Sequence, residues 1–169
     1  MRLVKRLFIC LALTLLFSAS AQAGLGVQVS YNHFETPEGE LSFLEGGDFG
    51  LGVRSDFGTS TLALVLSFDY YFPDGELTDV NFYELNANLV FTFPTEGFRP
   101  YVGGGVGIAR VSFDEDFFVD SETQTGVNIL GGVKFGGGGL TPFIEGRYVI
   151  YGDEEAFANR FVLSGGIMF

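Results

Sequence analysis

Apolar and polar residues alternate along most of the chain after residue 23. In the run 24–33, Leu25, Val27, Val29 and Tyr31 share one face, and glycine, glutamine, serine and asparagine occupy the other. A period of two is typical of a β-strand with one apolar face, whereas a helix would repeat every three to four residues. The pattern therefore predicts a strand at 24–33.

Seven further segments show the same alternation. Eight strands leave about 18 residues for each strand and its connection, which suits membrane-spanning strands of about 9 to 11 residues. We predict an all-β fold, an eight-stranded antiparallel up-and-down transmembrane β-barrel. The further strands are expected at about 46–55, 61–72, 80–93, 98–112, 123–135, 140–151 and 157–169.

The connections between these strands alternate in length and charge. Three are short and nearly neutral, and four longer ones hold 15 of the 21 acids. Outer-membrane barrels show this asymmetry, with short periplasmic turns and longer external loops. The short connections lie near 56–60, 94–97 and 136–139, and the long acidic ones at 35–45, 73–79, 114–122 and 152–155.

The two faces of each strand distinguish a membrane barrel from a soluble one. In the strand at 61–72, Leu64, Leu66 and Phe68 share one face, while Ser67 and Asp69 lie on the other. A lipocalin-like barrel or a secreted sandwich also alternates, but its dry core would exclude the polar set. Lipid outside and a polar lumen inside accommodate both faces.

The first 23 residues have the pattern of a secretory signal peptide. Three bases between residues 2 and 6 precede an apolar run at 7–17, and Ala21-Gln22-Ala23 fits a cleavage site. The apolar run is too short for a spanning helix, which needs about 20 residues. We predict a signal peptide at 1–23 and a barrel domain at 24–169. The only cysteine, Cys10, lies in the signal peptide, so the exported domain is expected to lack disulfides.

Composition narrows the range of partners. The 169 residues include 25 glycines, 20 phenylalanines and 7 tyrosines, and 21 acids face nine bases for a net charge of −12. So many aromatic residues argue against disorder. We expect no nucleic-acid partner, because phosphate binding depends on basic patches.

Aromatic residues gather toward both ends of the predicted strands. This distribution predicts two girdles of Phe and Tyr at the membrane interfaces. The girdle near the acidic connections would hold Tyr70, Tyr71, Phe72, Phe82, Tyr83, Tyr148 and Tyr151, and that near the short turns Phe91, Phe93, Phe98, Tyr101, Phe143 and Phe169.

The same alternation assigns a set of charged residues to the lumen. Unpaired charge in a narrow interior costs several kcal/mol, so four acids balanced by four bases favour a paired network that fills the barrel. A narrow channel for small solutes or ions remains the alternative. The predicted lumen charges are Asp48, Asp69, Glu84, Glu145, Arg54, Lys134, Arg147 and Arg160.

Within this set, Glu84, Glu145 and Arg147 are expected near mid-height, as the centre of the network. Arg54 and Lys134 are equally compatible with a hydrated rim, where an exposed pair contributes little. The phase of the strand at 98–112 stays open, because Arg110 either faces inward or extends its head outward to the interface.

The sequence shows no catalytic constellation. The only histidine, His33, is expected on the lipid-facing side near the external end of its strand, and Ser30 lies on the opposite face, so the two cannot form a nucleophilic pair. The glycines at 103–107 and 136–139 lack the helix and lysine of a phosphate loop and are expected to pack closely against lumen side chains. The acidic connections lack the ligand spacing of a calcium loop. We expect a protein without enzymatic activity, cofactor or metal.

The ending Phe161-Val-Leu-Ser-Gly-Gly-Ile-Met-Phe169 resembles the terminal strand by which outer-membrane barrels are recognised for assembly. The segments 99–109 and 143–148 resemble small barrels of the outer-membrane protein A transmembrane-domain and outer-membrane protein X type. The resemblance implies an integral, porin-like protein of the Gram-negative outer membrane, in contact with outer-membrane lipid and lipopolysaccharide, and with the barrel-assembly machinery during biogenesis. The implied assembly signal comprises Phe161, Leu163, Gly165, Ile167 and Phe169.

A structural or surface-interaction role is the function that these patterns favour. A narrow channel is the second interpretation and a lipid-modifying enzyme a distant third. The short external connections contain no recognisable binding motif, so the sequence identifies no surface partner.

Overall fold

The computed structural model describes residues 23–34, 47–72, 81–112, 121–136, 139–152 and 159–169. The predicted signal peptide, apart from Ala23, lies outside the described residues, as do nearly all of the four long acidic connections. In the described part of the chain, no helix is long and apolar enough to cross a membrane.

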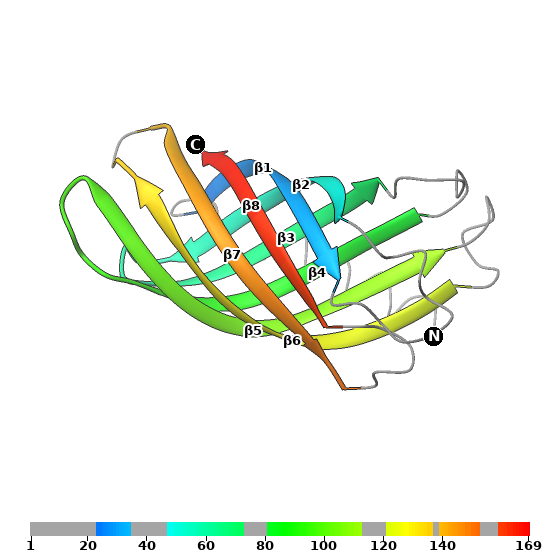
Figure 1. The fold of residues 1–169 in the computed structure, drawn as a ribbon. Coiled ribbons are helices and arrows are strands. Elements are labelled where there is room, and N and C mark those ends of the chain that lie inside the picture. Colours follow the sequence, from blue (N-terminus) through cyan, green and yellow to red (C-terminus); the bar gives the residue numbers. More distant parts are fainter. Residues whose placement is uncertain (1–22, 35–46, 73–80, 113–120, 137–138, 153–158) are drawn as a thin grey trace, which may run out of the picture.

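Eight antiparallel strands form one closed barrel (Figure 1). Each strand pairs with the next along the chain, and the last pairs with the first. All eight predicted strands are confirmed, and their ends agree with the prediction to within three residues. The strands are β1 (Ala23–Phe34), β2 (Gly47–Gly58), β3 (Leu62–Phe72), β4 (Asn81–Thr92), β5 (Phe98–Ser112), β6 (Ser121–Phe135), β7 (Thr141–Tyr151) and β8 (Arg160–Met168).

The seam between β1 and β8 closes the ring. Val29 lies opposite Gly165, and the pairing runs from Gly26 with Met168 to Phe34 with Arg160. Beyond the last paired residues, the Leu25 and Phe169 backbones exchange N–H to carbonyl bonds of 3.1 and 2.7 Å. In the described barrel, each of the eight strands therefore pairs with a neighbour on both sides, as a hydrocarbon environment requires.

Side chains separate by face as the alternation predicts. Large apolar side chains cover the outside; Leu25, Leu51 and Ile129, for example, are each more than half exposed. Polar and charged side chains such as Asn32 and Glu84 are fully buried inside. The molecule is thus apolar outside and polar inside, the inverse of a water-soluble barrel.

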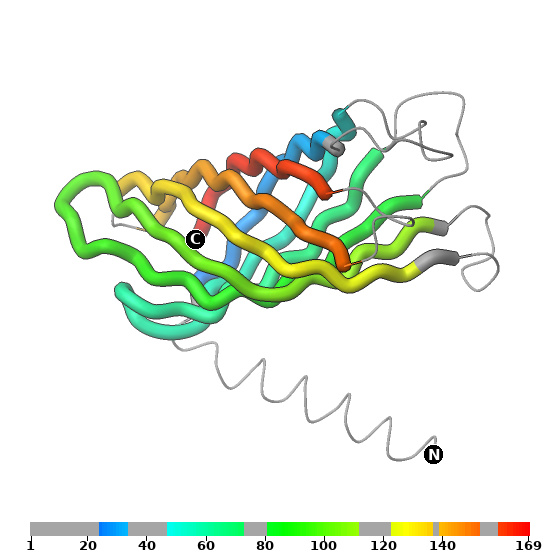
Figure 2. The backbone as a smooth tube through the Cα atoms, turned by 60° about the horizontal axis from the view of Figure 1, so that its bottom comes forward, coloured from blue at the N-terminus to red at the C-terminus, as the bar shows by residue number. Residues whose placement is uncertain are grey.

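The β2–β3 and β4–β5 turns lie at one end of the barrel, together with the C-terminus (Figure 1). Figure 2 shows β5 and β6 running side by side along the barrel, and the β4–β5 hairpin projecting at the short-turn end. We call the lumen opening at this end the short-turn mouth.

The glycines predicted to pack against lumen side chains divide into two groups. A Cβ atom at Gly107 would lie 2.4 Å from Asn86 Oδ1, so the prediction for 103–107 holds there. It is wrong for the described glycines of 136–139, because neither Gly136 nor Gly139 has an atom within 4 Å of that position. Gly136 instead adopts a positive φ of 81° in the turn, a conformation that glycine reaches without strain.

Candidate functional site

The lumen brings all eight predicted charges onto the inner face of the barrel. Seven of their side chains belong to residues that are at most 9% exposed, and the eighth, Lys134, has a side chain that is 13% exposed. Burial of this degree means that the seven buried charges depend on protein partners rather than on water. Two separate clusters supply most of these partners.

The first cluster, which we call the core cluster, consists of Asp69, Glu84, Arg147 and Arg160. Glu84 accepts a hydrogen bond from Arg147 Nη2 at 3.0 Å and forms an ion pair with Arg160 Nη2 at 2.5 Å. Arg147 Nη2 also lies 3.5 Å from Asp69 Oδ2. All four side chains are at most 1% exposed. Two cations thus face two carboxylates, and the cluster is neutral.

Neutral polar groups complete the coordination of Asp69. The Gln28 amide donates to Asp69 Oδ1 at 2.6 Å and the Ser30 hydroxyl donates to the same oxygen at 3.0 Å. Ser30 also shares a hydrogen bond of 2.9 Å with the Ser164 hydroxyl across the β1–β8 seam. Because a buried carboxylate needs several donors, these groups satisfy hydrogen-bond acceptor sites of Asp69 that the arginine does not reach.

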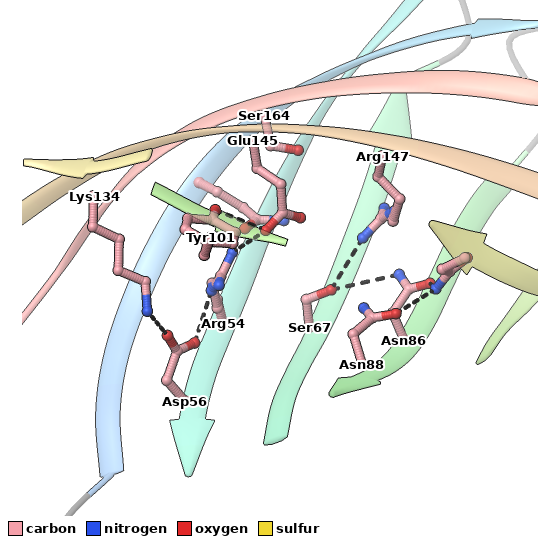
Figure 3. A network of polar contacts seen from close by, with 12 residues as sticks. Arg54, Asp56, Ser67, Asn86, Asn88, Tyr101, Lys134, Glu145, Arg147 and Ser164 are labelled. Atoms are coloured by element: carbon pink, nitrogen blue, oxygen red, sulfur yellow. Dashed lines mark hydrogen bonds and ion pairs between the residues drawn. The ribbon is translucent and has the colours of Figure 1, made fainter. Parts of the chain in front are cut away.

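The second cluster, which we call the mouth cluster, consists of Arg54, Asp56, Lys134 and Glu145 (Figure 3). Arg54 donates from Nε to Asp56 at 2.8 Å and from Nη1 to Glu145 at 2.6 Å. Lys134 Nζ lies 2.5 Å from the other Asp56 oxygen, and the Tyr101 hydroxyl donates to Glu145 at 2.9 Å. This cluster is also neutral, but the side chains of Asp56 and Lys134 are 11% and 13% exposed.

A belt of uncharged polar side chains lies beside Arg147 (Figure 3). Asn128 donates to Asn88 Oδ1 at 3.0 Å, and its amide nitrogen is 2.8 Å from the Asn86 amide. The Ser67 hydroxyl lies 3.5 Å from both Asn86 and Arg147. Each of these side chains is at most 5% exposed, so the belt fills the section of lumen that it occupies.

The ion pairs between different strands cross the lumen. Arg54 on β2 reaches Glu145 on β7, and Arg147 on β7 reaches Glu84 on β4. None of these strands is a neighbour of its partner in the ring. The bonds therefore act as braces between opposite walls, at positions where a water-filled pore would have to pass.

One arginine in each cluster lies against aromatic rings of the lumen, which corrects the prediction of two complete girdles. Arg160 lies 4.8 Å from the Phe82 ring centroid, and Arg54 lies 4.7 Å from that of Phe143, both within cation–π range. Five aromatic residues assigned to the girdles have at most 3% exposure and line the lumen instead; they are Tyr71, Phe82, Tyr101, Phe143 and Tyr151. Outward-facing rings such as Phe72, Phe91 and Phe93 remain at the two ends of the outer face.

The expected pairing in the centre of the network is also corrected. Glu145 hydrogen-bonds Arg54 and Tyr101, whereas Arg147, two residues along the same strand, pairs with Glu84 and Asp69. Sequence reasoning assigned Asp56 to a turn and missed it as a partner. The signal was present, because Asp56 continues the inward parity of Arg54.

Other predicted residues are placed as follows. In β5, Tyr101, Ala109 and Val111 are buried, so Arg110 has outward parity, which resolves the open phase of that strand. His33 is exposed on the outer face of β1. Of the assembly-signal residues, Phe161, Leu163 and Ile167 are exposed apolar side chains on β8, Gly165 shares their face, and Phe169 follows the strand at 61% exposure.

No metal centre is present in the described residues, which contain no group of three or more His, Cys, Asp or Glu positioned to hold an ion. The described lumen thus offers charge pairs and hydrogen bonds rather than a cluster of metal ligands.

The profile of the family described as "Outer membrane protein beta-barrel domain" matches residues 8–158, most of the chain. The chain belongs to the outer membrane protein beta-barrel domain family. This membership and the closed barrel together indicate a protein of the bacterial outer membrane. No curated protein is significantly similar to it in sequence.

Three solved structures show the same fold as this family member. Neisserial surface protein A (NspA) has a TM-score of 0.71 at 18% identity, and the alignment covers 86% of this chain and 95% of that one. Ail, the attachment invasion locus protein of Yersinia pestis, gives 0.57 at 15% identity with coverages of 87% and 97%. The outer membrane enzyme PagL gives 0.53 at 16% identity with coverages of 85% and 98%. Proteins with different roles thus share this barrel fold, so the fold alone does not identify the role of this chain.

Proposed function

We propose that this barrel has a structural or surface-interaction role in the outer membrane and does not serve as a pore. The observation that carries the proposal is the pair of neutral charge clusters that brace opposite walls of the lumen. An eight-stranded barrel has an interior that side chains can fill. Here ion pairs, aromatic rings and the belt of uncharged polar side chains occupy this interior.

The surface part of the proposal is supported by the distribution of charge and by two relatives in fold. The long connections hold 15 of the 21 acids, which would give the external rim a strongly acidic surface. NspA is named as a surface protein and Ail as an attachment invasion protein. A small barrel that displays loops at the cell surface fits both features, because loops on a rigid scaffold carry binding functions.

The similarity in fold to the enzyme PagL is the observation that favours a lipid-modifying activity. The described side chains do not support catalysis. His33 faces outward from β1, while Ser30 lies in the lumen and bonds Asp69 and Ser164. A nucleophilic serine needs its base within hydrogen-bond reach. This pair cannot provide that geometry.

Conductance across a planar lipid bilayer tests the proposal directly. We expect the refolded, unmodified protein to show no steady conductance. Arg147→Ala should give rare cation-selective openings, because it removes a cation from the braced section and leaves Asp69 with no arginine at its Oδ2 atom. Steady conductance by the unmodified protein would contradict the closed-barrel proposal and favour a narrow channel.

A further inference from the structure

A pocket of about 230 Å³ opens at the short-turn mouth of the barrel. Arg99, Lys134 and Asp56 contribute its charged side chains, and Thr59, Thr92 and Thr141 contribute hydroxyl groups. A water molecule takes up about 30 Å³ in the liquid, so the pocket has room for a small polyatomic ion with several waters. The lining mixes polar and apolar groups, and its charged side chains include more cations than carboxylates.

Arg99 is a cation of the pocket that has no carboxylate partner in the lumen network. The mouth cluster is neutral without it, since Arg54 and Lys134 already balance Asp56 and Glu145. Among the described residues, the Arg99 side chain has neither a hydrogen bond nor an ion pair, and its Nε atom is buried without a partner. A charged group is destabilising when one of its donors is buried without an acceptor. An acceptor from outside the chain would therefore stabilise Arg99 Nε.

The register of the sheet places a second cation beside it. Arg99 on β5 lies directly opposite Lys134 on β6, and both residues have lumen-facing parity. Like charges directly opposite each other across two strands destabilise a sheet. Asp56 offsets part of this repulsion through Lys134 but makes no bond to Arg99.

We propose that this pocket binds a phosphate group, held by the Arg99 guanidinium and the Lys134 ammonium. An oxyanion between the two cations would accept from the guanidinium in the forked geometry that suits phosphate and would offset the repulsion across β5 and β6. The phosphate is that of a free phosphate ion or of a lipid headgroup at the membrane surface. Because short turns face the periplasm in outer-membrane barrels, the site opens to that compartment. The proposal is independent of whether the lumen conducts.

Titration of the refolded full barrel with inorganic phosphate tests the site. The protein is held in a non-ionic, phosphate-free detergent at low chloride, and binding is followed by calorimetry and by phosphorus NMR. We expect saturable binding of one phosphate. Arg99→Gln should weaken it about tenfold, because a hydrogen bond to a charged group contributes roughly that factor.

Arg110→Gln is the matched control, since it removes the same charge from the same strand but on the outward face. It should leave phosphate affinity unchanged. Asp56→Asn should tighten binding several-fold, because it removes the carboxylate that competes for Lys134 while all pocket cations remain. This gain of affinity keeps the test decisive if Arg99→Gln fails to fold.

A second titration, with a short-chain phosphatidylglycerol, distinguishes the source of the phosphate. Binding of the lipid but not of inorganic phosphate, with the same dependence on Arg99 and Asp56, supports a headgroup site. Binding of both ligands supports a site for free phosphate. The proposal is overturned if neither ligand binds, or if the Arg99 and Arg110 variants bind with the affinity of the unmodified barrel.

Discussion

The core cluster and the mouth cluster contain the same number of cations and carboxylates but differ in their access to water. Side chains of the core cluster are at most 1% exposed, whereas Asp56 and Lys134 in the mouth cluster border the open pocket. The strength of a charge pair depends on the solvent around it, so equal composition does not mean equal energy.

The clusters also differ in how many partners each charge has. Glu84 is shared by two arginines, and Arg147 is shared by two carboxylates. At the mouth, Lys134 has a single ion-pair partner in the described residues, Asp56, which Arg54 also holds. Under the proposed function, the core cluster keeps the lumen closed, and the proposed phosphate site lies beside the more exposed mouth cluster.

The two clusters should differ most in the stability that the barrel loses when one cation is removed from each. Arg147→Ala should lower the free energy of unfolding by about 3–5 kcal/mol, because it leaves carboxylates buried without their partner. Lys134→Ala should cost about 1 kcal/mol or less, since water in the pocket can replace the ammonium and Arg54 still holds Asp56. Urea unfolding of barrels refolded into lipid vesicles measures both values. Equal losses would contradict the distinction between the clusters.

A smaller difference is expected in how strongly salt weakens the charge pairs of the two clusters. Double-mutant cycles give the coupling energy of Lys134 with Asp56 and of Arg147 with Glu84. The screening length falls to about 3 Å at 1 M salt, so the first coupling should decrease by about half or more between low and high salt. The second should stay constant, because the side chains of Arg147 and Glu84 are at most 1% exposed. A salt-dependent Arg147–Glu84 coupling would show that water and ions reach the core cluster.

The smallest expected effect is the loss of one tyrosine hydroxyl, and here the mouth cluster should lose more stability than the core cluster. Tyr101→Phe removes the hydroxyl that donates to Glu145 and should cost about 1 kcal/mol. Tyr71→Phe is the matched control beside Arg160, and it should be neutral or slightly stabilising because no described residue accepts from the Tyr71 hydroxyl. The same unfolding measurement compares them. A larger loss for Tyr71→Phe would mean that its hydroxyl has a partner in solution.

The architecture could be predicted from the sequence because alternation assigns both strand and face. Once Val27 is outward, Gln28 is inward, and the same rule extends along the chain. Eight runs with alternating connections then leave few arrangements other than an up-and-down barrel. The face rule also placed all eight predicted charges on the inner wall.

The partners of these charges could not be predicted in the same way. Parity gives the face of a residue but not its height or the direction of a long side chain, so Arg147 and Glu145 looked like neighbours although their bonds run to different strands. Clustering of aromatic residues at strand ends does not distinguish rings on the two faces. Applying parity to Tyr70 and Tyr71 separately would have assigned the second ring to the lumen.

The seam between Leu25 and Phe169 has a kinetic consequence. It joins residues from nearly opposite ends of the chain, so it has the longest sequence separation and the greatest loop-closure entropy of any strand pair in the barrel. Hairpins such as β4–β5 can form from local contacts, but the ring cannot close until the final strand is available. We therefore expect folding to be limited by closure, with a late transition state in which β8 docks on β1. Until that step, both edge strands have unsatisfied backbone groups that lipid cannot hydrogen-bond.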